Sequence, residues 1–237
     1  MRRVMKRRPT IPSWLPTDAS AGLWLDGSDA STITLDTGVS VWADKSGNSR
    51  HATQGTAGYQ PTYEGGIVSM TRAASQHMVI PVAAAPLMDR ILLFVAKVGA
   101  GKTAAASILA WSDATQANPS CRMGLGGAQT NVYWGGAYVV SGPAGTWTGE
   151  HRVHSIQLSN AAGTGTCSVR QNGSVIQTGT RAYSSFSTIT SFYLNRSKPA
   201  VAGHDLEVKE IMVLPYSAEN LANAEAYLAA KHSITLV

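Results

Sequence analysis

Short runs of alternating apolar and polar residues, separated by turn-forming residues, fill the N-terminal part of the chain. LWL at 23–25, TITL at 32–35 and VSVW at 39–42 are each followed by a turn that contains Asp, Gly or Asn. Alternation with a period of two is typical of strands that are buried on one face, because successive side chains point to opposite sides of a sheet. The pattern therefore predicts a β protein.

The later segments keep this pattern and add one strand of a different kind. Residues 91–98, ILLFVAKV, form a continuous apolar run, which is typical of a strand covered on both faces. Residues 167–171 and 174–177 flank Asn172-Gly173, and this dipeptide favours a two-residue hairpin turn because both positions accept a positive φ. We expect strands at all three places.

One segment has the period of a helix instead. Leu221, Ala224 and Leu228 fall on one face of a helix, and Ser217 is a suitable N-cap with Glu219 in the first turn. The spacing predicts a helix over 218–231.

Composition fits one large domain. A chain of 237 residues has a suitable length for one β-sandwich, and with 14% charged and 44% hydrophobic residues it can bury a sizeable core. No apolar run approaches the roughly 20 residues that cross a bilayer, and no apolar segment follows the basic N-terminus as a signal peptide requires. We therefore expect no membrane contact and no signal peptide. Cys121 and Cys167 either pair or remain separate as buried small hydrophobic residues.

The positive charge of the protein is concentrated at its N-terminus. Five of the 19 basic residues lie before residue 9 and the first acidic residue is Asp18, so the other 14 bases balance the 14 acids. Prolines at 9, 12 and 16 favour an extended path. We expect residues 1–21 to form a docking arm, and its contacting residues are Arg2, Arg3, Lys6, Arg7, Arg8, Ile11, Trp14 and Leu15.

Two interpretations of this arm remain open. A basic terminus of this kind is often a solvated tail. If it docks, its partner is either an acidic protein surface or the phosphate backbone of a nucleic acid, since Lys and Arg suit both. Trp14 and the prolines fit a groove on a protein better than a duplex, so nucleic acid is not the expected partner.

Several blocks of the sequence resemble one known family. They are WADKSGNSRHATQ at 42–54, QPTY at 60–63, the hairpin around Asn172-Gly173, and the strand at 205–216 with the helix after it. Together they resemble the concanavalin A-like (laminin-G-like) jelly-roll domains that are common in bacteriophage structural proteins and bacterial surface proteins. The resemblance implies an all-β, antiparallel jelly-roll sandwich over residues 22–237 that includes the C-terminal helix. TRAASQ at 71–76 differs from the turn that is common in relatives, which leaves open whether a rim cation site exists.

Candidate catalytic carboxylates lie in the segment DLEVKE at 205–210. The family that this chain resembles includes glycoside hydrolases with a strand that carries Glu-x-Asp-x-x-Glu or a shorter variant. The residues here that come closest to this motif are Asp205, Glu207 and Glu210. On a regular strand Glu207 and Glu210 point to opposite faces, so only a β-bulge would bring them together. A retaining pair needs its carboxyl groups about 5–5.5 Å apart, and Lys209 between them favours a plain surface strand. We expect no enzymatic activity.

Two other patterns suggest sites and are weaker. GKT at 101–103 resembles the end of a phosphate-binding loop, which also requires Gly at position 96. That residue is Ala96, so we expect an ordinary hairpin loop there. His151 and His154 are three residues apart, so on a strand they face opposite ways and make a poor metal pair. We expect no cofactor and no metal.

Aromatic residues crowd around the glycine pair at 135–136. Tyr133, Trp134 and Tyr138 are the candidate carbohydrate-binding residues, because exposed rings beside a turn stack well on sugar rings. The alternative is that they point inward and fill the core, as aromatic residues of sandwiches often do.

These observations give three hypotheses from different classes. The first is a non-enzymatic structural accessory protein of a phage virion, either a head decoration or a tail component, which is assembled in the host cytoplasm in several copies or as a homo-oligomer. Its arm would contact capsid or tail subunits. The alternative is a carbohydrate-binding adhesin or receptor-binding module for host or environmental glycans. The third is a glycoside hydrolase that uses Glu207 and Glu210.

Overall fold

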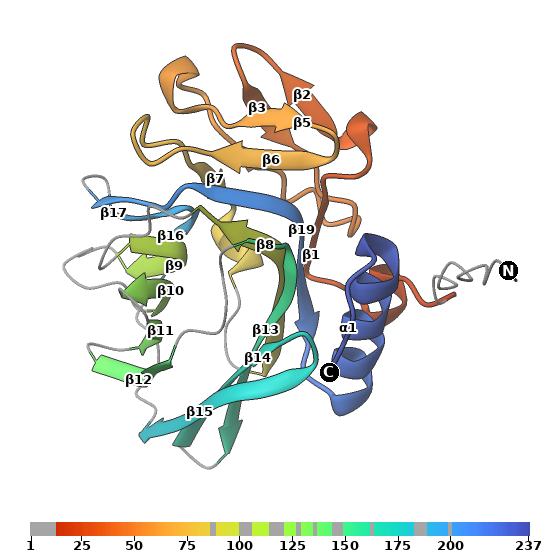
Figure 1. Cartoon of the computed structure of the whole chain (residues 1–237), viewed down its shortest axis with the longest axis vertical. Coiled ribbons are helices and arrows are strands. Elements are labelled where there is room, and N and C mark those ends of the chain that lie inside the picture. Colours follow the sequence, from red (N-terminus) through yellow and green to blue (C-terminus); the bar gives the residue numbers. More distant parts are fainter. Residues whose placement is uncertain are drawn as a thin grey trace, which may run out of the picture.

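Two antiparallel sheets pack face to face and form a β-sandwich. The structure is a computed structural model, and it describes residues 13–85, 89–99, 106–113, 121–126, 129–134, 137–143, 149–161, 164–182, 189–198 and 201–237. Figure 1 shows the two sheets side by side, with the C-terminal helix α1 on the far side of one of them. The predicted all-β sandwich with one C-terminal helix is therefore confirmed.

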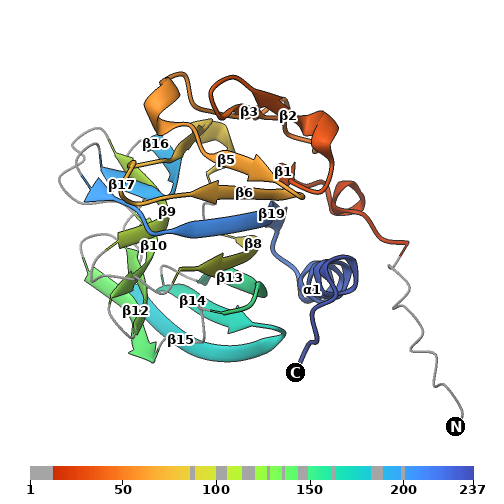
Figure 2. The same ribbon diagram turned by 45° about the horizontal axis from the view of Figure 1, so that its top comes forward.

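Sheet A has eight strands and carries the helix. Its order across the sheet, visible from top to bottom in Figure 2, is β5, β6, β19, β8, β13, β14 and β15, and β1 pairs with β19 as well. The strands are β1 (Leu23–Asp26), β5 (Thr62–Glu64), β6 (Ile67–Met70), β8 (Arg90–Val98), β13 (Arg152–Ala161), β14 (Thr164–Gln171), β15 (Ser174–Ala182) and β19 (Leu206–Pro215).

Sheet B has nine strands in the order β12-β11-β10-β9-β16-β7-β4-β3-β2. They are β2 (Ile33–Leu35), β3 (Val39–Trp42), β4 (Ala52–Thr53), β7 (Met78–Ile80), β9 (Ala106–Asp113), β10 (Cys121–Gly126), β11 (Gln129–Trp134), β12 (Ala137–Pro143) and β16 (Ile189–Leu194). A small separate pair consists of β17 (Arg196–Lys198) and β18 (Val201–Ala202), and the short 3₁₀ helices are η1 (Pro16–Ala19), η2 (Ala30–Thr32), η3 (Ala57–Tyr59) and η4 (Val82–Ala84).

The central strand β8 explains why its segment is apolar without alternation. Leu92 and Phe94 face the interior between the sheets, whereas Ile91, Leu93 and Val95 face α1. Both faces of the strand are therefore covered, and seven of its side chains lose almost all contact with water. The predicted strand with two buried faces is confirmed.

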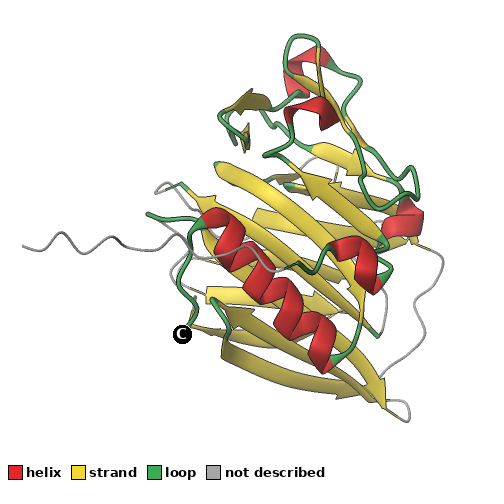
Figure 3. Cartoon of the chain, turned by 90° about the vertical axis from the view of Figure 1, so that its right-hand side faces the viewer, coloured by secondary structure: helices red, strands yellow, loops and turns green. Residues whose placement is uncertain are grey.

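Helix α1 (Ala218–His232) lies across the strands of sheet A, as Figure 3 shows. The Ser217 side chain accepts a hydrogen bond from the backbone N–H of Asn220, which is the expected N-cap. Leu221, Ala224 and Leu228 are buried against the sheet. The helix is confirmed, and it extends one residue beyond the predicted end.

The segment that carries the family resemblance holds β1 in place. The Asp44 carboxylate accepts hydrogen bonds from the backbone N–H groups of Trp24, Ser46 and Arg50 at 2.9–3.0 Å. Arg50 in turn donates to the carbonyl of Gly22. This segment thus has a structural role, because it ties the turn after β3 to the first strand of the other sheet.

The Asn172-Gly173 turn joins β14 to β15 as predicted. Both residues have a positive φ, 47° and 85° respectively. Asn172 does more than turn the chain, since its side-chain oxygen accepts a hydrogen bond from the backbone N–H of Val153 at 3.0 Å.

Only the second part of the predicted arm, from residue 13 on, belongs to the described residues. Residues 1–12, which include Arg2, Arg3, Lys6, Arg7, Arg8 and Ile11, lie outside the described part of the chain. The ring of Trp14 packs edge-on against Tyr227 of α1, with ring centroids 5.9 Å apart, and Leu15 is 44% exposed. Trp14 therefore contacts the helix of its own chain, and a partner for the arm stays a prediction.

Candidate functional site

Strand β19 loses its regular alternation at Lys209. Its register with β8 shifts between Val208 and Glu210, which is a β-bulge. Val208 and Ile211 both face the interior between the sheets, although they are three residues apart. The bulge therefore places Glu207 and Glu210 on the same face, the one that carries α1.

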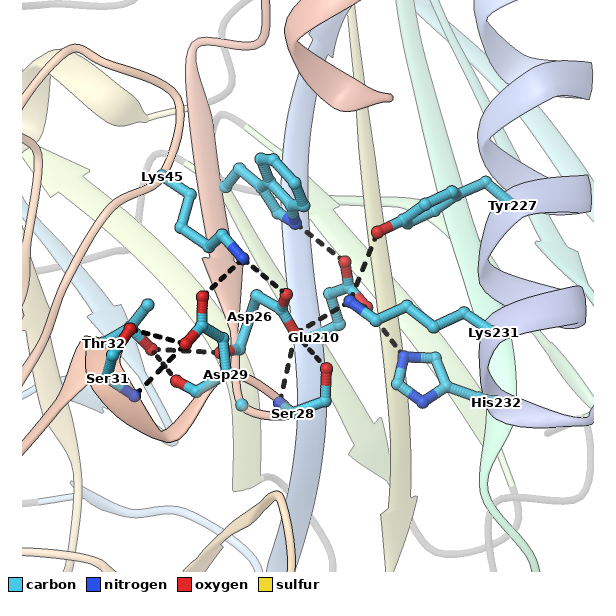
Figure 4. Close-up of polar contacts among 12 residues, drawn as sticks. Asp26, Ser28, Asp29, Ser31, Thr32, Lys45, Glu210, Tyr227, Lys231 and His232 are labelled. Atoms are coloured by element: carbon cyan, nitrogen blue, oxygen red, sulfur yellow. Dashed lines mark hydrogen bonds and ion pairs between the residues drawn. The ribbon is translucent and has the colours of Figure 1, made fainter. Parts of the chain in front are cut away.

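Glu210 is the centre of a buried polar cluster, drawn in Figure 4. Its side chain has no exposed surface, and it accepts a hydrogen bond of 2.7 Å from Nε1 of Trp24. Its second oxygen lies 2.9 Å from Nζ of Lys231 and 2.7 Å from Nε2 of His232. These contacts join the last turn of α1 to the middle of sheet A.

A second carboxylate extends the cluster towards the N-terminal segment. Asp26 is 3% exposed, and its two oxygens lie 2.8 Å from Nζ of Lys231 and 3.0 Å from Nζ of Lys45. Lys45 also reaches Asp29 at 2.7 Å and lies 4.7 Å above the centre of the Trp24 ring. A cation above an indole face adds electrostatic attraction to the ion pairs.

The charges of this cluster stabilise one another. Burial acts to lower the pKa of Lys231, but Glu210 and Asp26 outweigh it and raise that pKa above its ordinary value. Burial likewise acts to raise the pKa of Asp26, yet its contacts with Lys231, Ser28 and Lys45 lower it. Both groups are therefore charged across the neutral range. The cluster attaches α1 to β1 and β19, and its two buried carboxylates, Glu210 and Asp26, are too enclosed to receive a ligand.

A depression of about 590 Å³ opens on the surface next to this cluster. It lies where the start of β13, the Asn172-Gly173 turn and the end of α1 meet. Its volume falls within the range of small-molecule sites, roughly 300–1,000 Å³. The lining side chains that can form hydrogen bonds include Glu150, Arg152, Asn172, Lys209, His232 and Thr235.

The lining of the depression favours an anion. Arg152 and Lys209 are basic residues that line it, and Glu150 is the one carboxylate among its lining residues. The Nε–H group of Arg152 is buried and has no hydrogen-bond acceptor among the residues that the structure describes. A buried donor without an acceptor is costly, so a bound carboxylate or sulfate group at this place would be stabilised.

His151 at the edge of the depression is neutral at physiological pH. Burial lowers its pKa to about 4, with a further contribution from Lys209, while Glu207 opposes this shift. Glu207 lies 3.5 Å from Nε2 of His151 and 3.0 Å from Nζ of Lys97. The neutral imidazole can act as a hydrogen-bond donor or acceptor for a polar ligand.

The predicted carboxylate pair is only partly assembled. The bulge brings Glu207 and Glu210 to one face, as the hydrolase hypothesis requires. Glu210, however, is fully buried and engaged by Trp24, Lys231 and His232, while Glu207 is 34% exposed and paired with Lys97. A sugar could not reach Glu210, so these two groups do not form a catalytic pair around a substrate.

The register of sheet B places Tyr133 and Tyr138 in one cross-strand row and Trp134 in another. Tyr133 is aligned, through β10 and β9, with Tyr193, and Tyr138 pairs with Tyr133. Trp134 is aligned instead with Trp111, which is buried between the sheets. The side chains of Tyr133, Trp134 and Tyr138 lie outside the described part of the structure, so their role in binding sugars stays a prediction.

The structure describes Cys167 and the two histidines of β13 and the residue before it, His154 and His151. Cys167 is a free thiol, and burial raises its pKa to about 12, so this residue acts as a small hydrophobic group. His154 stacks on Phe94 in the interior, whereas His151 lies on the side of α1. The two histidines do face opposite ways.

The residues that the structure describes contain no group of three or more His, Cys, Asp or Glu side chains arranged for a metal ion. No helix among them combines the length and the apolar character that crossing a membrane requires.

Comparisons with known proteins find similarity in structure alone. No protein-family model matches the sequence, and no curated protein matches it either. The fold is similar to Trypanosoma rangeli sialidase in complex with sialic acid, with a TM-score of 0.66 and 14% identity over 95% of this chain and 35% of that one. It is also similar to the receptor binding domain of botulinum neurotoxin D, with a TM-score of 0.59 and 10% identity over 92% of this chain and 54% of that one.

A further similar structure is the botulinum neurotoxin serotype D ligand binding domain in complex with N-acetylneuraminic acid, with a TM-score of 0.59, 10% identity and coverage of 92% and 53%. The chain thus spans about a third of the sialidase and half of the toxin domains. At these identities the similarity shows the fold, an all-β sandwich. The expectation that the chain is not an enzyme is contradicted, because sialidases are among the proteins with this fold.

The basic depression was not predicted from the sequence. Arg152, Lys209 and His232 come from three distant segments, and only the packing of α1 on sheet A brings them together. The sequence did hold one signal, the lysine between two glutamates in a strand. Lys209 was interpreted as an ordinary surface residue, because the bulge that redirects this strand has no signature in the sequence.

Proposed function

We propose that the chain binds carbohydrate and that the depression beside α1 holds an acidic sugar. The observation that carries this proposal is the buried Nε–H of Arg152, which has no acceptor among the described residues. A second basic residue, Lys209, lines the same depression. A sugar carboxylate would accept from Arg152 in a charge-assisted hydrogen bond. Asn172, Thr235 and Glu150 offer donors and acceptors for hydroxyl groups.

The comparisons support this class of ligand. Two of the similar structures are complexes with sialic acid or N-acetylneuraminic acid, which carry a carboxylate on a pyranose ring. This is the second of the three functions expected from the sequence, an adhesin or receptor-binding module, and it agrees with these structures better than the first.

Binding of N-acetylneuraminic acid, measured by titration calorimetry at low salt, tests the proposal. Wild-type protein should bind it in preference to N-acetylglucosamine, which has no carboxylate. Arg152→Met should weaken binding by about tenfold or more, because a hydrogen bond to a charged group contributes roughly 1.5–3 kcal/mol. The matched control is Arg90→Met, since Arg90 is an exposed arginine at the start of β8 and lies outside the depression.

Two results would overturn the proposal. One is wild-type protein that binds neither sugar at millimolar concentration. The other is an Arg152→Met variant that is folded and binds the acidic sugar as tightly as the wild type does.

The phage virion hypothesis has less support. None of the similar structures named above is a virion, capsid or tail protein, and the basic residues on which the hypothesis depends lie within residues 1–12, outside the described part of the chain. A location in the virion and a contact between the arm and capsid or tail subunits remain proposals. They are compatible with carbohydrate binding by the body of the protein.

A further inference from the structure

His232 connects the buried polar cluster to the depression beside α1. It is the last residue of α1, and it is one of the residues that line the depression. Its Nε2 atom lies 2.7 Å from the Oε2 atom of Glu210, whose side chain is fully buried, while the side chain of His232 is 6% exposed. One imidazole therefore belongs both to the buried cluster and to the lining of the depression.

The contact with Glu210 determines which ring nitrogen of His232 carries a proton. Glu210 accepts a hydrogen bond of 2.7 Å from Nε1 of Trp24, and its Oε2 atom lies 2.9 Å from Nζ of Lys231. An ionised carboxylate accepts hydrogen bonds and donates none, so Nε2 of His232 carries the proton that it donates to Glu210. Nδ1 is then an acceptor in the neutral ring and a second donor in the charged ring.

The edge of the ring that bears Nδ1 is the one left for a ligand. Figure 4 shows one ring nitrogen of His232 turned towards Glu210 and the other turned away from it. Because Glu210 encloses the Nε2 side, a molecule in the depression approaches His232 from the other side. The same ring orientation serves both protonation states, and only the role of Nδ1 changes between them.

We propose that His232 contacts the acidic sugar in the depression and that this sugar binds together with one proton, which is held at Nδ1. This inference rests on the proposed function and adds its regulation by pH. The neutral ring presents a lone pair at Nδ1, which repels a carboxylate, whereas the charged ring donates a charge-assisted hydrogen bond. Glu210 is a positioning residue, since it holds the ring in one orientation and does not itself reach the ligand.

Charged groups of both signs surround His232. Negative charge comes from the C-terminal end of α1 and from carboxylates on three segments, and positive charge comes from α1, β19 and β13. The carboxylates are Glu210, Asp26 beyond Lys231, and Glu150; the basic residues are Lys231, Lys209 and Arg152; the other titratable neighbours are Tyr227 and His151. A bound carboxylate adds negative charge to this balance. It therefore favours the charged ring, and by reciprocity the proton favours binding of the carboxylate.

His151 does not supply this proton site in the neutral range. Burial lowers its pKa to about 4, so its ring stays neutral above about pH 5. Histidine is the side chain whose charge ordinarily changes between pH 5 and 8. Of the two histidines that line the depression, His232 is thus the one to which we assign the proton.

Titration calorimetry of the full chain with N-acetylneuraminic acid tests the inference between about pH 5.5 and 8, where carboxylic acids are ordinarily ionised. Measurements at constant ionic strength in two buffers with different ionisation enthalpies give the number of protons taken up. The affinity of the wild type should fall as pH rises, by at most about tenfold per pH unit, which is the limit for one linked proton.

His232→Gln should remove this dependence on pH, because its amide keeps a donor for Glu210 and has no proton to take up. Its affinity should match that of the wild type at high pH and be weaker at low pH. The matched control is His51→Gln, since His51 is partly buried, lies outside the depression and accepts a hydrogen bond from the backbone N–H of Asp44 through Nδ1. This control should keep the profile of the wild type.

The outcomes separate this inference from the proposed function. If Arg152→Met weakens binding at every pH while only His232→Gln loses the pH dependence, both stand. If Arg152→Met weakens binding but the wild type takes up no proton, or if folded His232→Gln keeps the profile of the wild type, the assignment of His232 is wrong and the acidic-sugar site stands. If Arg152→Met binds like the wild type, the proposed function is wrong.

A measurement on the wild type keeps the test valid if His232→Gln does not fold. Nitrogen-15 NMR distinguishes a neutral imidazole protonated at Nε2 from the charged ring. At about pH 7.5, N-acetylneuraminic acid should convert the His232 signal from the neutral to the charged form. A ring that stays in the same form with and without the sugar would overturn the inference.

Discussion

Removal of Lys231 should destabilise the whole protein, because this residue neutralises two buried carboxylates. Its Nζ lies 2.8 Å from Asp26 and 2.9 Å from Glu210, which are 3% and 0% exposed. We take Lys231→Met as the perturbation, since methionine keeps most of the aliphatic length and removes only the charge.

The magnitude follows from the geometry. At an effective dielectric constant of about 20, each of these two contacts has an attraction on the order of 6 kcal/mol. The cost of desolvating the lysine offsets a large part of it, and breaking one partner of a buried ion pair typically costs about 3–5 kcal/mol in total. Lys45 still pairs with Asp26, and Trp24 and His232 still contact Glu210, so we expect the lower part of this range.

Equilibrium denaturation in urea gives the free energy of unfolding directly. A loss of about 3 kcal/mol should also lower Tm by roughly 6–12 °C for a chain of this size. The matched control is Lys97→Met, because Lys97 pairs with Glu207 at 3.0 Å while both are about a third exposed. Exposed ion pairs contribute about 0–1 kcal/mol.

The pH range of the measurement follows from the two pKa shifts. The pKa of Lys231 is raised, so its contribution is present below the unfolded value of 10.5 and is lost as pH rises above it. The pKa of Asp26 is lowered, so its contribution is present above the unfolded value of 3.8 and is lost as pH falls below it. Between these limits the effect of Lys231→Met should be constant.

A second variant identifies the cause. If repulsion between unneutralised carboxylates destabilises Lys231→Met, adding Glu210→Gln should restore part of the lost stability, and the two changes should not be additive. A loss below about 1 kcal/mol for Lys231→Met, equal to that of the exposed control, would refute the reasoning about this cluster.

Three further predictions concern other parts of the fold. Burial lowers the pKa of His154 to about 3, so the protein should lose stability as pH falls from 6.5 towards 3, by up to about 1.4 kcal/mol per pH unit for this group. In urea titrations, the free energy of unfolding of His154→Leu should depend less on pH than that of the wild type. An equal pH dependence of the two proteins would contradict this. Gly173→Ala should cost about 1–2 kcal/mol because of its φ of 85°, whereas Gly55→Ala, in open space with no positive φ, should be near neutral by the same assay. In a Cys121→Ser background, the buried thiol of Cys167 should react with a disulfide reagent only after unfolding, and rapid labelling of native protein would contradict its burial.

Local patterns predicted most of the elements because their causes are local. The Asn172-Gly173 hairpin, the capped helix after Ser217 and the apolar strand β8 each depend on a few neighbouring residues. The turn requires positive φ, the helix requires a capping oxygen, and a strand with two covered faces requires apolar residues at every position. Each of these was confirmed.

The site could not be predicted in the same way. The bulge in β19 is defined by its pairing with β8, so its effect on Glu207 and Glu210 appears only in the assembled sheet. The cluster around Glu210 joins residues from β1, β19 and the end of α1, and Trp24 and Glu210, which share a hydrogen bond, are 186 positions apart in the sequence. Spacing alone therefore could not show that Glu207 and Glu210 share a face, or that Glu210 is buried in ion pairs and out of reach of a substrate.

The sequence by itself determined that this chain is a β-sandwich with a terminal helix, because alternation, turn residues and capping are properties of short segments. The tertiary structure alone decided where charge and aromatic rings meet. Packing α1 on sheet A buries Glu210 and brings His232 to the depression that Arg152 and Lys209 also line, and the register of β7 and β16 sets Tyr193 next to Val79. Such contacts depend on which elements become neighbours, and the packing of the whole chain determines that.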